Sequence, residues 1–245
     1  MVVKSQTKLI KNLQQKKYRN VHGLFVVEGI KTVNELLDSS FKAYKVFAIN
    51  PELFGQKTDK LEKISAGELR KLSNLKTPNE VLGVFEIPPA KPLNFDQWIV
   101  ALDTVQDPGN LGTIIRLCDW FGITQLLCSK ETVDCYNPKV LQATMGSISR
   151  VNVVYEDLSE IFGDTHLPVY GTFMNGHSVY EEKWPEAGIL LLGNEANGIS
   201  SGLHSFIHKK IGIPQFGENT AESLNVATAA AIFMNEIKRV GVIQK

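Results

Sequence analysis

Cysteine is scarce in this sequence of 245 residues. Its three cysteines are Cys118, Cys128 and Cys135, and no two of them form a CxxC pair. An odd and scattered set argues against a disulfide framework, so we expect three reduced, mostly buried thiols. The sequence also lacks an HExxH pattern, and His204 and His208, although four positions apart, have no nearby third ligand. We therefore expect no metal site.

Long apolar runs are missing as well. None approaches the roughly 18 to 20 residues that span a bilayer. The first residues do not contain an apolar signal-peptide core followed by a small-residue cleavage site. We therefore expect a soluble, cytoplasmic protein with no membrane partner. A hydrophobic fraction of 43% is ordinary for a globular protein, and the length suits one large domain or two modest ones.

The chain has no excess of charge of either sign, because 26 basic residues balance 26 acidic ones. Their distribution is nevertheless uneven, since Glu28 is the first acidic residue and six basic residues precede it. These six are Lys4, Lys8, Lys11, Lys16, Lys17 and Arg19. The cluster is either a solvated helix face or frayed terminus, or a surface that contacts phosphates.

The first 88 residues alternate between strand and helix patterns. Strands are predicted at 24–27, 44–49 and 81–87, and helices at 5–15, from Gly29 onward and at 65–72. Ser65 and Glu68 form a capping-box start for the last of these helices. The alternation predicts a small α/β domain at residues 1–88. Three prolines within residues 88–92 cannot continue a helix or a central strand, so we place a linker at 89–97.

Residues 98–245 alternate more clearly and form the second predicted domain. Strands are predicted at 98–102, 125–128, 151–154, 169–172, 189–192 and 210–213, and helices at 110–121, 138–144, 158–162 and 224–238. Near-continuous apolar strands separated by helices predict a parallel sheet that is covered on both faces. Ligands in such sheets bind beyond the carboxyl ends of the strands, so the loops there are the candidate site.

Three of these loops stand out. Residues 103–116 run from a strand through the turn Pro108-Gly109-Asn110 into a helix, whose free N–H groups suit an anion. Residues 191–200 have a glycine near each end of the loop, but they form neither a P-loop nor a GxGxxG motif. Residues 213–226 enter the last helix, with Ser223 as a candidate N-cap. Taken alone, the first two loops are better explained as structural turns, and Ser223 in the third is explained as a helix cap.

Taken together and in this order, the three loops resemble the signature motifs of the SpoU, or TrmH-like, branch of the knotted SPOUT methyltransferases. The matching residues are Asp107-Pro108-x-Asn110-x-Gly112-x-x-x-Arg116, then Gly193-Asn194-Glu195-x-x-Gly198-Ile199, then Ile213-Pro214 with Ser223-Leu224-Asn225-Val226. The segment Asn137-Pro138-Lys139-Val140 also fits the family. Gln15-Lys16-Lys17-x-Arg19 and residues 24–29 resemble the family's auxiliary substrate-binding domain.

The resemblance implies an S-adenosylmethionine-dependent RNA 2′-O-ribose methyltransferase, a homodimer, and a deep trefoil knot in the C-terminal domain. Cofactor binding is implied for Thr172, Gly193, Glu195, Ile213, Leu224 and Asn225. Catalysis is implied for Asn110, Arg116, Glu195, Ser223 and Asn225. RNA contacts are expected from Lys8, Lys11, Lys16, Lys17, Arg19 and Lys139. Ribosomal RNA is preferred over transfer RNA because the chain has an N-terminal domain like those of the rRNA branch.

Some alternatives stay open at this stage. Arg116 either takes the 2′-proton or stabilises negative charge, and an arginine suits the second role better because it is effectively always protonated. Gln215, Ala227 and a long loop at 217–223 depart from the family pattern, which affects the exact cofactor contacts. Two other functions remain: a catalytically silent RNA-binding or assembly factor, and a dinucleotide-dependent oxidoreductase, which would need the missing GxGxxG motif.

Overall fold

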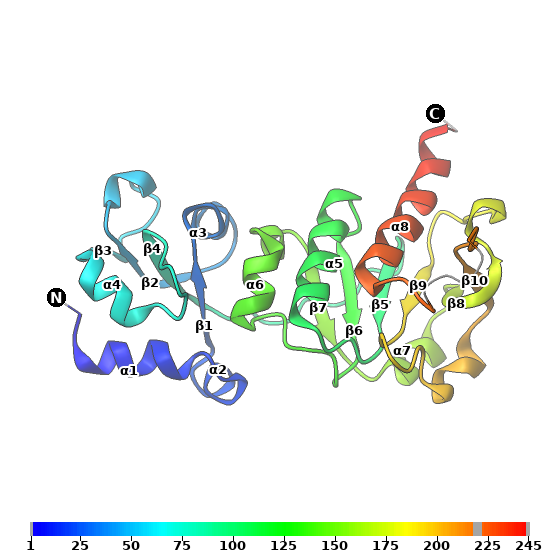
Figure 1. Ribbon diagram of the computed structural model, residues 1–245, viewed down its shortest axis with the longest axis horizontal. Helices are drawn as coiled ribbons and strands as arrows, with labels where there is room; N and C mark the ends of the chain where they lie inside the picture. Colours follow the sequence, from blue (N-terminus) through cyan, green and yellow to red (C-terminus); the bar gives the residue numbers. More distant parts are fainter. Residues whose placement is uncertain (1, 218–221, 244–245) are drawn as a thin grey trace. The chain divides into compact units, whose positions relative to one another are not determined.

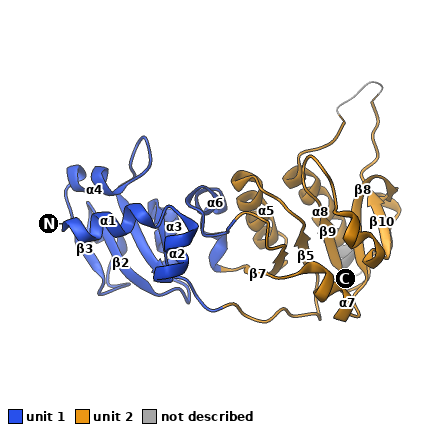
Figure 2. Ribbon diagram, turned by 90° about the horizontal axis from the view of Figure 1, so that it is seen from below, with its two compact units in different colours: residues 1–89, 134–149 blue, residues 90–133, 150–245 orange. Residues whose placement is uncertain are grey.

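The computed structural model describes residues 2–217 and 222–243, and these divide into two compact units. Unit 1 contains residues 1–89 and 134–149, and unit 2 contains residues 90–133 and 150–245 (Figure 2). The division at residue 89 falls in the proline-rich stretch. Residues 134–149, by contrast, lie within the range 98–245 that the sequence assigned to a single domain, yet they pack with the N-terminal residues.

Unit 1 is built on a mixed four-stranded sheet with strand order β1-β4-β2-β3. β4 pairs antiparallel with both β1 and β2, and β3 pairs parallel with β2. The strands are β1 (Leu24–Glu28), β2 (Ala43–Ala48), β3 (Leu61–Lys63) and β4 (Val81–Glu86). β3 was not predicted, because its three residues include only one apolar side chain.

The helices of unit 1 cover this sheet and include one that comes from the later part of the chain. They are α1 (Lys4–Asn12), α2 (Lys16–His22), α3 (Ile30–Leu37), α4 (Ala66–Leu72) and α6 (Pro138–Thr144), with 3-10 turns η1 (Pro51–Phe54) and η2 (Ser147–Ser149). Ile10 and Leu13 pack with Phe47 and Leu82 in the core. α2 was not predicted, and the predicted helix at 5–15 ends early, at Asn12. The predicted capping box of α4 is confirmed, with the Ser65 side chain accepting from Glu68 N.

Unit 2 is built on a six-stranded parallel sheet with strand order β10-β8-β9-β5-β6-β7 (Figure 1). The strands are β5 (Ile99–Leu102), β6 (Gln125–Cys128), β7 (Asn152–Tyr155), β8 (Val169–Ser178), β9 (Ile189–Leu192) and β10 (Lys209–Gly212). The α/β class and the parallel sheet expected from the sequence are therefore confirmed. The trefoil knot that the resemblance implies stays a prediction.

Helices flank this sheet and bury its apolar residues. They are α5 (Pro108–Trp120), α7 (Leu158–Asp164) and α8 (Val226–Ile243), with 3-10 turns η3 (Val179–Glu181) and η4 (Ser201–Phe206). α5 and α8 pack against each other (Figure 1). The three cysteines of the chain are free and buried, as expected. Burial raises the pKa of the Cys118 thiol in α5 far above its usual range, so this thiol is not a nucleophile.

Two glycines allow close approach of the backbone where β8 meets β10. The pairing register jumps between Lys210 and Ile211, which face Gly171 and His177 respectively. A Cβ atom on Gly176 would lie 2.2 Å from the carbonyl carbon of Ile211, and one on Gly212 would lie 2.6 Å from a backbone oxygen of Phe173. Only glycine fits at such contacts, so the two glycines are required for the close approach of β8 and β10.

Within the described ranges, no helix is long and apolar enough to cross a membrane.

Candidate active site

Three polar side chains from three separate loops meet in unit 2. Asn110 lies in the first turn of α5, Glu195 follows β9, and Asn225 directly precedes α8. Asn110 Nδ2 donates to Glu195 Oε1 at 2.7 Å, and Asn225 Nδ2 donates to Asn110 Oδ1 at 2.9 Å. The structure thus joins three of the five catalytic residues implied by the resemblance in one hydrogen-bonded network.

Helix capping fixes the direction of this network. Asp107 Oδ1 accepts from Asn110 N at 2.8 Å and caps α5. Asn225 Oδ1 accepts from the N–H groups of Ala227 at 2.9 Å and Thr228 at 3.2 Å, so Asn225 caps α8. Because its oxygen serves the helix, the amide nitrogen of Asn225 faces Asn110. The orientation of the Asn110 amide follows, with its nitrogen toward Glu195.

This capping corrects one expectation. The sequence suggested Ser223 as the N-cap of a helix beginning at Leu224, but α8 begins at Val226. Asparagine caps helices as well as serine does, and Asn225 is the residue immediately before the helix. Ser223 is exposed and forms no hydrogen bond with the described residues. Its side chain is therefore available to a ligand rather than required by the helix.

The loop that carries Glu195 is tied to the end of β5. Asn194 Nδ2 donates to Thr104 O at 2.8 Å, and Asp103 Oδ2 accepts from Ser200 N at 2.7 Å. Asp103 is buried, with 3% of its surface exposed. A buried carboxylate that accepts a backbone N–H is a strong contact, and here it spans 97 residues of sequence. These two bonds hold the start and the end of the Glu195 loop.

The backbone at Thr104 is unusual, because its φ of 55° lies in the left-handed region. Such a conformation is unfavourable for a β-branched residue and persists only when its surroundings hold it. Ser129 Oγ accepts from Thr104 N at 3.0 Å, and Asn194 donates to Thr104 O, so the residue is held on both sides. Neither Asp103 nor Asn194 was given a role from the sequence. For Asp103, the available signal was a polar residue directly after a buried apolar strand.

Gly193 closes the same loop. A Cβ atom on Gly193 would lie 2.2 Å from the backbone carbon of Gly198, and Gly198 itself has a φ of +67°. Asn194 and Gly198 also exchange two backbone hydrogen bonds of 2.9 Å. The glycine at 193 is thus required by the loop itself, in addition to any approach of a ligand.

Arg116 lies on α5, six residues after Asn110, which is about 9 Å further along the helix axis. It is exposed and makes no hydrogen bond or ion pair with the described residues. The structure therefore does not join Arg116 to the Asn110 network. It leaves the guanidinium free for an outside anion.

A cavity of about 380 Å³ lies beside these loops, between β8, the segment after β10 and α8. It is lined by Thr172, Ile213 and Leu224 from the implied cofactor residues, and by Ser223 from the implied catalytic residues. Gly193, Glu195 and Asn225 do not line it. The aromatic part of the lining, which was not predicted from the sequence, consists of Phe173, Phe216 and Phe233.

The lining of this cavity fits S-adenosylmethionine. Its volume lies in the range of about 300 to 1,000 Å³ that is usual for ligand pockets. Phe216, Met174 and Leu224 are 87%, 66% and 51% exposed, which is unusual for large apolar side chains next to a cavity. A heterocyclic ring would cover such surfaces. Glu222 adds a carboxylate for a cationic group. Among the described residues, no group of histidine, cysteine and acidic side chains is arranged to hold a metal ion.

The residues expected to contact RNA lie in unit 1 and have different environments. Lys8 and Lys139 are exposed, and Lys17 lies over the Tyr18 ring at 4.9 Å. Lys11 Nζ donates to Ser73 O at 2.9 Å and to Asn74 Oδ1 at 3.0 Å, so it is held in place near the surface. Lys16 is exposed and has an interaction of its own.

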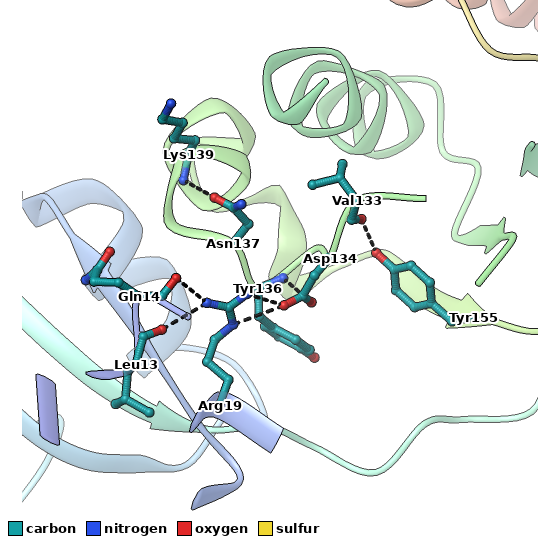
Figure 3. A network of polar contacts seen from close by, with 9 residues as sticks. All are labelled: Leu13, Gln14, Arg19, Val133, Asp134, Tyr136, Asn137, Lys139 and Tyr155. Carbon is teal, nitrogen blue, oxygen red and sulfur yellow. Dashed lines mark hydrogen bonds and ion pairs between the residues drawn. The ribbon is translucent and has the colours of Figure 1, made fainter. Parts of the chain in front are cut away.

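Arg19 requires a correction. It was expected to contact RNA, but it is 2% exposed and forms an ion pair with Asp134. Its Nη1 also donates to the carbonyl oxygens of Leu13 at 2.9 Å and Gln14 at 3.0 Å (Figure 3). A buried arginine with these partners is not available to a phosphate. The sequence could not distinguish it from its exposed lysine neighbours, because its acceptors come from the backbone and from a residue 115 positions away.

Comparison with known proteins agrees with this geometry. Residues 97–235 match the SpoU rRNA Methylase family, and residues 4–83 match the MRM3-like substrate binding domain. The Bacillus subtilis 23S rRNA (guanosine(2553)-2′-O)-methyltransferase RlmP is 29% identical over 235 residues, covering 93% of this chain and 94% of the relative.

Two solved structures are similar over the whole fold. A protein of the TrmH family from Porphyromonas gingivalis is 34% identical, with a TM-score of 0.90 over 98% of this chain and 99% of that one. An AdoMet-bound rRNA methyltransferase from Sinorhizobium meliloti is 28% identical, with a TM-score of 0.88 over 98% and 97% of the two chains. The sequence motifs, the parallel sheet and the family match agree: the chain belongs to the SpoU rRNA methylase family.

Proposed function

We propose that this protein transfers a methyl group from S-adenosylmethionine to a ribose 2′-oxygen of ribosomal RNA. The observation that carries the proposal is the network of Asn225, Asn110 and Glu195, which links all three motif loops beside the cavity. A structural turn in each loop, the alternative reading, does not require these side chains to meet.

The cavity lined by Thr172, Ile213 and Leu224 is the proposed cofactor site. When bound there, S-adenosylmethionine supplies a methyl group on a cationic sulfur, which is a good leaving group without a metal. Phe216 and Met174 offer apolar surface to the adenine ring. Glu195 does not line this cavity, but the hydrogen bonds of Asn110 link it to Asn225, which directly follows the lining residue Leu224. The charge of its carboxylate attracts the cationic cofactor.

The residues of the chain have two tasks in the transfer. They must hold the ribose 2′-oxygen in line with the methyl carbon, and they must favour negative charge on that oxygen. The 2′-oxygen would form the new carbon–oxygen bond as the cofactor gives up its methyl group and becomes a neutral thioether, and the 2′-proton would pass to solvent water. Ser223, which is exposed and has no partner among the described residues, is placed to donate a hydrogen bond to the ribose or the cofactor.

Arg116 is proposed as the electrostatic element of the site. Its guanidinium is effectively always protonated, so it suits the stabilisation of a developing oxyanion, or a grip on the adjacent phosphate, better than proton removal. Its exposure and its freedom from protein partners within the described ranges support either contact. The residue therefore acts mainly as charge develops, and mutation should affect the rate more than the fold.

Ribosomal RNA is favoured over transfer RNA by the N-terminal domain. Residues 4–83 match a substrate-binding domain, and the B. subtilis relative that matches over 93% of the chain is a 23S rRNA enzyme. We therefore propose large-subunit rRNA as the first substrate to test. The intact network and the free Arg116 argue against a catalytically silent assembly factor. A cytoplasmic location is consistent with an rRNA substrate and stays a prediction.

A homodimer is also proposed. Trp120, the last residue of α5, is 83% exposed, and a side chain of this size is rarely left in water without a partner. A second copy of the chain is the proposed occupant, because the family resemblance implies a dimer. Light scattering at micromolar concentration should give twice the mass of one chain, and Trp120→Glu should shift the mass toward that of a monomer.

The enzymatic proposal is tested by methyl transfer in vitro. Purified protein is incubated with methyl-labelled S-adenosylmethionine and either rRNA or tRNA from cells that lack the gene. We expect label in rRNA, in a dinucleotide that resists alkaline hydrolysis because its 2′-oxygen is blocked. Label in tRNA alone would identify tRNA, and not rRNA, as the substrate. A complete lack of label in both RNAs, with intact cofactor binding, would favour the silent assembly factor.

A further inference from the structure

Unit 1 contains a hollow of about 200 Å³ that the proposed reaction does not use. It lies between β1, the start of α3, the segment after α4, and α6. Its floor is apolar and includes Val26, Leu75 and Leu141, whereas its rim carries polar side chains. The polar rim residues are Gln14, Glu28, Thr32, Asn74, Lys139 and Gln142.

One wall of the hollow, α6, is held in place by the buried Arg19. Arg19 Nε donates to Asp134 Oδ2 at 3.0 Å, while its Nη1 donates to Leu13 O and Gln14 O (Figure 3). Tyr136, just before α6, packs on Phe25 with ring centroids 4.7 Å apart. The wall that carries Lys139 and Gln142 is therefore fixed to the N-terminal residues before any ligand arrives.

The rim is prearranged by hydrogen bonds of its own. Lys11 Nζ donates to Asn74 Oδ1 at 3.0 Å, and Asn74 N donates to Glu28 Oε1 at 3.2 Å. The oxygen of the Asn74 amide is thus occupied, which leaves its nitrogen free to donate. The side-chain amides of Gln14 and Gln142 and the ammonium of Lys139 have no partner among the described residues. These side chains therefore offer unengaged hydrogen-bonding groups, whereas both oxygens of Glu28 already accept, one from Asn74 N and one from the Ser73 hydroxyl.

We propose that this hollow binds one unstacked base of the substrate RNA. Apolar surface with several amide groups and one carboxylate matches a planar heterocycle, whose faces are apolar and whose edges carry hydrogen-bonding groups. Its volume is below the usual range for drug-sized ligands, which favours a single ring system over a whole nucleotide. Lys139 lies at the rim and Lys11 is hydrogen-bonded to the rim residue Asn74, so both can contact a sugar-phosphate chain that passes there.

The proposal rests on RNA being the substrate, and it names a specificity site outside the three methyl-transfer motif loops. Its consequence is that the protein distinguishes RNA from a base-free chain of equal charge. One bound base typically contributes about 1 to 3 kcal/mol, which corresponds to an affinity ratio of about 5 to 150.

The test uses the full chain and fluorescence anisotropy with single-stranded RNA octamers of A, C, G or U, and with an octamer that carries no bases. We expect wild-type protein to bind at least one base-bearing octamer about tenfold more tightly than the base-free one. Gln142→Trp fills the hollow from an exposed position of α6, so it should remove most of this preference and leave the affinity for the base-free octamer unchanged. Gln56→Trp, an exposed glutamine of unit 1 outside the hollow, is the matched control and should keep the preference.

Lys139→Ala separates charge from base recognition. This variant should bind base-bearing and base-free octamers more weakly by the same factor, because it loses a phosphate contact. Equal affinity of wild-type protein for all five octamers, or a full preference in Gln142→Trp, would overturn the hollow as a base site while leaving methyl transfer to rRNA intact. Binding of no octamer at all would also overturn it. Loss of the proposed function would show instead as absent methyl transfer in the assay described above.

Discussion

Asn110 Nδ2 lies 2.7 Å from Glu195 Oε1, although the two residues are 85 positions apart in the chain. The contact joins the first turn of α5 to the loop after β9, and Asn225 extends it to the start of α8. Each residue is also fixed by its own loop, through a helix cap or through the bonds that Asn194 makes to its neighbours. The three loops therefore act as one unit, and mutations in any of them should affect the same step.

The first prediction concerns the charge of Glu195. Glu195→Gln keeps an oxygen that can accept from Asn110 but removes the negative charge. The variant should bind S-adenosylmethionine about two- to fivefold more weakly, the scale of a partly exposed charge contact. It should bind S-adenosylhomocysteine nearly as well as the wild type, because that product lacks the cationic sulfur. Isothermal titration with both ligands measures the difference, and an equal loss for both would show that the charge is not aimed at the sulfonium.

The second prediction concerns Arg116. Arg116→Ala should leave the thermal midpoint and the S-adenosylmethionine affinity nearly unchanged, because the residue is exposed and has no partner among the described residues. Single-turnover methyl transfer should fall by roughly a hundredfold or more, the usual scale for losing one transition-state donor. Arg116→Lys should restore little, since a point charge lacks the planar fork. Arg70→Ala, at an exposed arginine of α4, is the matched control. A wild-type rate in Arg116→Ala would remove this residue from the mechanism.

The third prediction separates the backbone at position 104 from its side chain. Thr104→Gly keeps the N–H and carbonyl that bind Ser129 and Asn194, and it relieves a strained φ worth about 1 to 3 kcal/mol. Glycine costs about 0.5 to 1 kcal/mol in chain entropy, so stability should stay level or rise slightly. Methyl transfer should be preserved.

Asn194→Ala is the counterpart of that variant. It removes the bond to Thr104 O and loosens the loop of Glu195, so methyl transfer should fall roughly tenfold or more, the scale expected when catalytic groups lose their alignment. Thermal melts and single-turnover rates on both variants check the pair. If Thr104→Gly transferred methyl slowly while Asn194→Ala kept the wild-type rate, the Thr104 side chain would matter and the Asn194 bond to its backbone would not.

The fourth prediction concerns acid stability of unit 1. Hydrogen bonds from Ser65 N, Val2 N and the Ser65 hydroxyl lower the pKa of Glu68 from 4.5 to about 2. A carboxylate whose pKa is lower in the folded state contributes stability above its unfolded pKa, and that stability is lost as pH falls. The stabilising contribution of Glu68 to unit 1 should therefore be lost as the pH falls from about 4.5 to about 2. Urea unfolding of Glu68→Gln should show a weaker pH dependence in this window, and an identical dependence would contradict the assignment.

The sequence predicts the elements with strong local signals. α6 begins at Pro138 as expected, because proline suits the first turn of a helix and Asn137 caps it. The motif loops also lie where a parallel sheet places its ligand sites. Their order along the chain, more than any single residue, carried the resemblance to the family.

Long-range contacts are what the sequence could not predict. Arg19 and the neighbouring lysines look alike in the sequence, yet Arg19 is buried against Asp134 and helps to hold α6 in unit 1. Asp103 and Asn194 lie within predicted loops, but their partners Ser200 and Thr104 are 97 and 90 residues away. The start of α8 at Val226 depended on whether Ser223 or Asn225 caps it, and both residues are good caps.

The central claim is that the chain methylates a ribose 2′-oxygen in ribosomal RNA. It is tested most directly by mapping 2′-O-methyl groups in rRNA from cells with and without the gene. The account predicts that one rRNA 2′-O-methyl group disappears on deletion, returns with the wild-type gene, and does not return with Arg116→Ala. An unchanged 2′-O-methylation map of rRNA in the deletion strain would contradict the claim.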